Sequence, residues 1–125
     1  MVKDLSNAAE VSRISALTSL TGEMSSEGDI RVDGKVSGKL TAKGKIVAGE
    51  GAVINGILAC SNIDCWGTIE GDIYVSELLA LKSTAVITGH IYTRKLQVEI
   101  GAQINGSCHM IISDEEFEKL INPEQ

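Results

Sequence analysis

Three cysteines and two histidines are the side chains of this sequence that could hold a transition-metal ion. Cys60 and Cys65 are five residues apart, and Cys108 is followed directly by His109. Tight zinc sites usually place their ligands two to four residues apart in paired clusters, and this spacing provides no such cluster. We therefore predict no metal and no cofactor, and we expect the thiols to act as small apolar side chains.

Four aspartates and the histidines are the candidates for acid–base or transfer chemistry. The aspartates are Asp29, Asp33, Asp64 and Asp72. They could suggest a polysaccharide lyase, but they stand in turn-rich stretches where aspartate is favoured for backbone reasons. The segment 46–54 resembles a hexapeptide-repeat acyltransferase. That class needs a regular six-residue period and usually a catalytic histidine, for which His90 and His109 are the available residues. We predict that the chain is not an enzyme and keep the acyltransferase as an alternative.

The net charge of the chain restricts the classes of partner that it is expected to bind. The net charge is −6 and the isoelectric point about 4.8, whereas nucleic-acid binding needs a basic footprint. No glycine run ends in Gly-Lys-Ser/Thr, so we expect no nucleotide site either. One basic cluster stands out, which is Lys35, Lys39, Lys43 and Lys45. It predicts either a solvated face or a docking patch for an acidic partner or lipid head groups.

Glycine marks an internal repeat that would position these side chains. The pattern apolar–any–Gly–any–apolar occurs six times, and its glycines are Gly22, Gly38, Gly56, Gly71, Gly89 and Gly106. The spacings are 16, 18, 15, 18 and 17 residues. Each repeat carries two period-2 apolar pairs separated by a turn with small residues, and period 2 is typical of strands. The repeat is therefore built from strands.

Alignment of the repeats predicts columns of stacked apolar residues. One column is Leu20, Val36, Ile54, Ile69, Ile87 and Ile104, and a second is Met24, Leu40, Leu58, Ile73, Ile91 and Cys108. About 17 residues at ~3.3 Å each suit one coil of a three-sided solenoid, and coils stacked ~4.8 Å apart satisfy each other's backbone groups. We predict an all-β, single-domain β-solenoid of about six rungs, with an antiparallel β-sandwich as the alternative.

The repeat resembles that of the bactofilins, a family of bacterial cytoskeletal proteins. The segments that carry the resemblance are 25–34 (SSEGDIRVDG), 43–47 (KGKIV), 78–85 (LLALKSTA), 93–96 (TRKL) and 101–110 (GAQINGSCHM). The resemblance covers about residues 17–112. It implies a right-handed β-helix that polymerises end to end without nucleotide into apolar filaments, often on the inner membrane, as a scaffold for cell-shape and envelope-remodelling proteins. Family members often carry Phe at the position of Ile104 and an aromatic residue in a membrane-targeting start, and this chain has neither.

The end rungs are the predicted polymerisation interface. Its residues are Leu20, Met24, Ile30 and Val32 at one end and Ile104, Cys108 and Met110 at the other. Neither set carries a charge or proline, the devices that usually protect an unpaired strand edge. Stacking of rungs between molecules would satisfy both backbone and core, unless the chain's own tails cap the two edges.

Two tails are expected to flank the solenoid of residues 17–112. Residues 1–16 read as a flexible tail in which Met1, Val2 and Leu5 could contact a membrane. The start has no signal-peptide hydrophobic region, so we expect a cytoplasmic protein, with a further option at the inner face of the cytoplasmic membrane.

In the C-terminal tail, residues 113–125, a short helix would place Phe117 and Leu120 on one face. That face would fold back on the solenoid, cover the terminal rung or dock a partner. The sequence thus predicts a scaffold that polymerises with itself and organises envelope proteins, with a non-filamentous adaptor as the alternative.

Overall fold

A computed structural model describes residues 11–121 of the chain. Its strands are β1 (Val11–Ile14), β2 (Ser19–Ser26), β3 (Asp29–Val32), β4 (Lys35–Ala42), β5 (Lys45–Ala48), β6 (Val53–Cys65), β7 (Thr68–Leu81), β8 (Val86–Val98) and β9 (Gln103–Met110). One helix follows, α1 (Asp114–Ile121). All strand pairs are parallel, and each strand pairs with the strand one repeat further on. The fold is the predicted β-solenoid of about six rungs.

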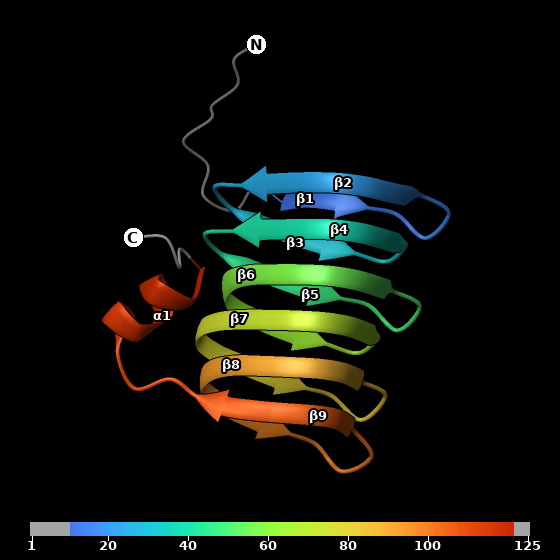
Figure 1. Cartoon of the computed structure of the whole chain (residues 1–125). Coiled ribbons are helices and arrows are strands. Elements are labelled where there is room, and N and C mark those ends of the chain that lie inside the picture. Colours follow the sequence, from blue (N-terminus) through green and yellow to red (C-terminus); the bar gives the residue numbers. More distant parts are fainter. Residues whose placement is uncertain (1–10, 122–125) are drawn as a thin grey trace.

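The chain coils in a right-handed sense, because it descends clockwise when viewed from the N-terminal end (Figure 1). Each rung has three faces. Face A comprises the strand residues before the repeat glycine, and face B comprises those after it. Face C is formed by β1, β3, β5 and the last four residues of β6, β7 and β8.

The six repeat glycines pair in register and form one column along the molecule. Every one of them has a positive φ between 124° and 145°. At Gly71 a Cβ atom would overlap the carbonyl oxygen of Gly56 in the preceding rung. Glycine is therefore required in this column for two reasons, namely its backbone conformation and the close approach of neighbouring rungs.

The irregular spacing of the glycines has a simple structural origin. Each rung contains eight paired residues on faces A and B and four on face C, as in β4 and β5. The corner between faces B and C takes one or two residues, and the turn between faces C and A takes two or four. The register along the columns is therefore constant while the length of a repeat varies from 15 to 18 residues.

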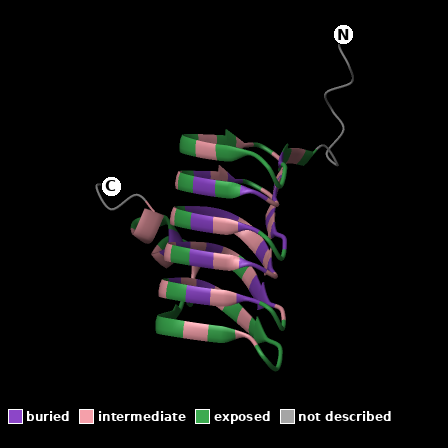
Figure 2. Ribbon diagram, turned by 90° about the vertical axis from the view of Figure 1, so that its right-hand side faces the viewer, coloured by how far each residue is buried: buried purple, intermediate pink, exposed green. Residues whose placement is uncertain are grey.

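The apolar columns predicted from the sequence are confirmed in full by the strand register. Their members in the interior rungs, such as Ile54, Leu58, Ile69 and Ile73, have no exposed surface. Figure 2 shows this gradient, with buried residues concentrated in the middle rungs and exposed residues in the first and last. The core is thus a stack of aliphatic layers, and burial of such side chains typically stabilises a fold by about 1.5–3 kcal/mol each.

The solenoid begins earlier than residue 17, where we expected it. Strand β1 lies inside the segment expected to be a tail, and it pairs with β3 through Ser12↔Ile30 and Ile14↔Val32. Ile14 is buried and belongs to the apolar core. The repeat was obscured here because Ser12 occupies an inward position that is Ile in the next two rungs.

Candidate functional sites at the ends and on the flank

The first rung consists of β1 and β2, and the last consists of the end of β8 together with β9. Leu20, Met24 and Ile104 lie in these rungs, packed against the core but only partly buried. Cys108 is exposed although its column partner Ile91 is fully buried one rung away. Among residues 11–121, these side chains have no neighbour on one side because the ladder stops at their rung.

Two of the predicted interface residues lie elsewhere than expected. Ile30 and Val32 have no exposed surface, because β1 covers them on the N-terminal side. The end of face C is formed instead by Ser12 and Ile14. At the opposite end, Met110 is 47% exposed and Val98, which the prediction omitted, is 46% exposed. A search for an apolar residue eighteen positions before Val32 would have found Ile14 and shown the extra strand.

Helix α1 packs against β7 on the side of the solenoid and does not cover the last rung (Figure 1). The expected folding back is thus observed, and the alternative of a gate over the terminal rung is wrong. Ser113 accepts a hydrogen bond from the Glu116 N–H at 3.1 Å and caps the helix. Phe117 is buried, whereas Leu120 and Ile121 are half-buried.

Glu116 ties the helix to the last strand. Its Oε2 lies 2.6 Å from Nε2 of His109, and its Oε1 accepts the Ile112 N–H at 3.0 Å. These two contacts, the backbone hydrogen bond foremost, lower the pKa of the Glu116 carboxyl below its usual value. His109 also lies next to Tyr92, which stacks on Tyr74 with ring centroids 4.9 Å apart. The helix is therefore attached to β7 by packing and to β9 through the His109–Glu116 contact.

The four lysines of the basic cluster do not share one surface. Lys35 is exposed on face A, and Lys39 is exposed on face B. Lys43 lies at the corner between faces B and C, where it pairs with Glu27 at 3.3 Å, and Lys45 on face C pairs with Asp64 at 3.0 Å. The bend at Gly38 between faces A and B and the corner after Ala42 separate residues that are close together in the sequence.

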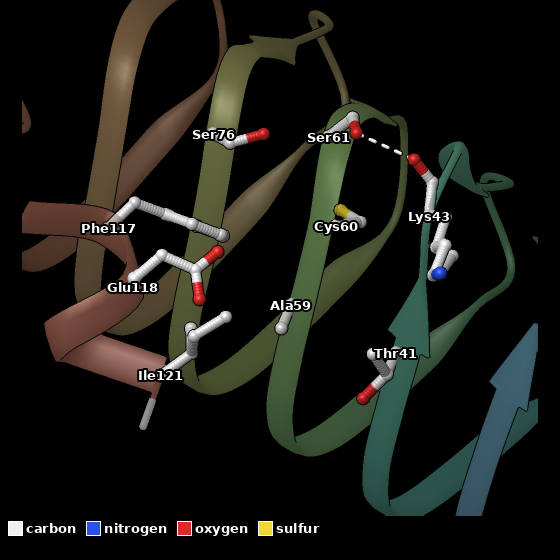
Figure 3. A pocket seen from close by; sticks show the side chains of 10 residues that line it. Thr41, Lys43, Ala59, Cys60, Ser61, Ser76, Phe117, Glu118 and Ile121 are labelled. Atoms are coloured by element: carbon white, nitrogen blue, oxygen red, sulfur yellow. Dashed lines mark hydrogen bonds between the residues drawn. The ribbon is translucent and has the colours of Figure 1, made fainter. Parts of the chain in front are cut away.

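Two of these lysines instead border a groove with α1. One hollow of about 400 Å³ is lined by Thr41, Ala42, Lys43, Ala59, Cys60, Ser61, Ser76, Phe117, Glu118 and Ile121 (Figure 3). A second, of about 460 Å³, is lined by Lys39, Thr41, Ile57, Ala59, Tyr74, Leu120 and Ile121. The structure thus brings Lys39 and Lys43 together with Phe117 and Leu120, which the sequence analysis had proposed as separate docking features.

The groups considered for catalysis have structural contacts. Asp29 Oδ1 accepts the Lys45 N–H of the next rung at 2.8 Å, and Asp33 forms a bidentate pair with Arg31 at 2.9 and 3.1 Å. His90 Nδ1 lies 2.7 Å from Ser107 Oγ on an exposed face. Across residues 11–121, no three His, Cys, Asp or Glu side chains are arranged to hold a metal ion.

The cysteines differ in exposure. Cys60 and Cys65 are buried, and burial raises the pKa of Cys60 and brings that of Cys65 to about 11. Partial burial also raises the pKa of the exposed Cys108. No helix within the described part of the chain is long and apolar enough to cross a membrane. Met1, Val2 and Leu5, proposed as membrane contacts, lie outside the described residues.

The comparison with protein families agrees with this geometry. The family model named Bactofilin, described as polymer-forming cytoskeletal, matches residues 12–109, which span the solenoid from β1 to β9. The chain belongs to the bactofilin family. Bactofilins are a structural, polymer-forming family, so membership implies that the chain associates with copies of itself.

A curated relative supports the bactofilin assignment. Bactofilin BacO of Myxococcus xanthus (strain DK1622) is 25% identical over 91 residues, which cover 73% of this chain and 72% of BacO. No solved structure gives a significant match. The residues that match the family model begin in strand β1, which was expected to belong to the N-terminal tail.

Proposed function

We propose that this bactofilin assembles end to end, without nucleotide, into filaments that act in the cytoplasm or at the inner face of the cytoplasmic membrane and organise cell-shape or envelope proteins. One observation supports the end-to-end contact most directly, namely the position of the exposed large apolar side chains. Among residues 11–121 these are Val11, Leu17, Ile57, Val98, Ile100, Met110 and Ile112. All except Ile57 lie on the first or last rung or directly after it.

The ends are also geometrically suited to stacking. The first rung contains a complete set of faces in β1 and β2, and the last contains a complete set in β8 and β9. Within the described residues, each end therefore presents unpaired backbone groups on all three faces at one level. A second copy stacked there would satisfy those groups and bury Leu20, Met24, Ile104 and Cys108.

The test replaces an end-rung residue with arginine. Leu20→Arg or Ile104→Arg places a charge where the next rung would pack, and we expect loss of filaments in negative-stain electron microscopy and of pelleting without nucleotide. Thr88→Arg is the matched control, because Thr88 is an exposed outward residue of an interior rung. Undiminished filaments from both end variants would rule out the proposed contact, and a discrete wild-type oligomer would favour the adaptor.

A further inference from the structure

The groove beside α1 is a second surface of the molecule, separate from the ends. Its two hollows share Thr41, Ala59 and Ile121, so they meet beneath the last turn of the helix. Figure 3 shows Phe117 and Ile121 reaching from α1 toward the strands, one of which carries Ala59 and Cys60. The helix therefore forms one wall of the groove and leaves much of the floor uncovered.

The groove exists because one outward column changes size along the molecule. The column on face B reads Thr41, Ala59, Tyr74, Tyr92 and His109 in register. The aromatic side chains of the later rungs form a raised, stacked wall, whereas Thr41 and Ala59 leave a shelf. A helix that packs against β7 at the level of Tyr74 cannot fill the space above this shelf. The step in side-chain size is thus the physical cause of the hollows.

The lining of each hollow combines apolar surface with one lysine at its margin. In the larger hollow, Lys39 is the single charged residue among the described residues of the lining, and it stands beside Ile57, which is 39% exposed. Ile57 is the only exposed large hydrophobic side chain of the interior rungs within the described residues. In the smaller hollow, Lys43 pairs with Glu27 at 3.3 Å and Glu118 also lines the hollow, so the charge of this lysine is partly balanced. The larger hollow is therefore the stronger candidate for binding an acidic group together with an apolar one.

We propose that this groove binds a short acidic segment of a partner protein. One large apolar side chain of that segment enters the hollow over Ile57 and Tyr74, and a second enters the hollow beside Phe117. Neighbouring carboxylates pair with Lys39 and Lys43 at the margins. The volumes of about 460 and 400 Å³ each admit a large aliphatic or aromatic side chain. Lysines on the margin of an apolar groove add selectivity for acidic over basic segments.

The position of the groove keeps it accessible in a filament. It lies on face B and at the corner between faces B and C of interior rungs, between β4 and β7, whereas the proposed polymer contact uses only the end rungs. Each subunit of an end-to-end filament would then display one groove on its flank. The binding itself does not depend on assembly, so the two proposals can fail separately.

The test uses the full chain and an array of labelled eight-residue peptides, each with two leucines and three glutamates and with one to three residues between the leucines. Fluorescence anisotropy measures binding, with lysine-for-glutamate and serine-for-leucine peptides as probes of charge and anchor. Lys39→Ser should weaken the best peptide about tenfold, which corresponds to about 1.4 kcal/mol. Ile57→Ser should weaken it to a similar extent. Lys35→Ser removes the same charge from the same strand on face A and should change the affinity less than twofold.

Specific outcomes decide the proposal. The proposal is supported by saturable binding that falls with added salt, is lost in both altered peptides, and is reduced by K39S but not by K35S. Absence of binding by every acidic peptide overturns it, as does equal loss in K39S and K35S. Tighter binding by a chain lacking residues 1–10 would assign the groove to the chain's own N-terminal segment instead and would also overturn it. Pelleting of K39S and I57S like wild type shows that the variants are folded and leaves the filament proposal independent.

Discussion

The end rungs and the interior rungs of this molecule contain the same kinds of side chain at the same positions, but their environments differ. Ile87 is fully buried, whereas Ile104, its partner one rung further on, is only partly buried. Gly71 would clash with the preceding rung if it carried a Cβ atom, whereas no described residue lies within 4 Å of that position at Gly22. The difference shows that a rung buries its apolar side chains against the neighbouring rungs. A rung at either end of a solenoid therefore lacks the core contacts that a further rung would supply.

The glycine column gives the largest expected contrast. Gly71→Ala should destabilise the fold by at least about 3 kcal/mol, since it combines left-handed backbone strain with overlap against Gly56. Gly22→Ala should lose about 1–2 kcal/mol from backbone strain alone. Urea unfolding followed by circular dichroism measures both, in an Ile104→Arg background chosen to block the proposed end-to-end contact. Equal losses would show that the end rung is packed as tightly as the interior.

The apolar column provides the next comparison. Ile54→Ala removes a fully buried side chain and should cost about 3 kcal/mol, including the cavity left behind. Ile104→Ala should cost about 1 kcal/mol in the unassembled protein, because its side chain is still partly in water. The measurement is again urea unfolding, here in a Leu20→Arg background. A loss for Ile104→Ala as large as that for Ile54→Ala would contradict the description of the ends as incomplete.

The turns between faces C and A allow the end rungs to be compared with the interior rungs without any change to the core. Leu17 and Ile100 are fully exposed in the turns of the first and last rungs, whereas the equivalent interior turns carry Glu50 and Thr84. Leu17→Ser combined with Ile100→Ser should raise the critical concentration for assembly about fivefold, which corresponds to about 1 kcal/mol. Glu50→Ser combined with Thr84→Ser is the control and should leave the critical concentration unchanged. Sedimentation over a concentration series distinguishes the two pairs, and equal shifts would remove the turn tips from the contact.

Thiol reactivity gives the smallest perturbation. In unassembled protein, Cys108 should react with a thiol reagent while Cys60 and Cys65 react only after unfolding. Its rate should still rise as the pH passes the usual thiol range, because partial burial raises its pKa and the thiolate is the reactive form. Assembly should protect it by stacking a second rung on β9. Labelling followed by mass spectrometry assigns each site, and an unprotected Cys108 in filaments would argue against contact at that end.

Most of the fold could be predicted because a solenoid repeats one local rule. The period of the apolar residues and the glycine positions together define the register, and no long-range pairing has to be guessed. The prediction failed at β1, where Ser12 replaces the expected inward aliphatic residue. A single polar substitution in the first rung is tolerated because that rung is only half enclosed.

The candidate sites were less predictable. Ile104, Cys108 and Met110 lie in the last rung as expected, whereas Val98 at the same end was missed. The groove depends on where α1 lies, and this helix packs against β7, the strand that carries Tyr74. The lysine cluster illustrates the same limit. The bend at Gly38 and the corner after Ala42 place its members on different faces, and no composition argument reveals which of them meet the helix.

The constant register of the rungs has a mechanical consequence. Within one molecule, neighbouring rungs are joined by the parallel hydrogen-bond ladder and also by the covalent chain that winds from each rung to the next. A contact between two molecules would have the hydrogen-bond ladder but no covalent connection. A rod pulled along its axis would therefore part between subunits while each subunit kept its shape, so that broken fragments would retain ends able to join again.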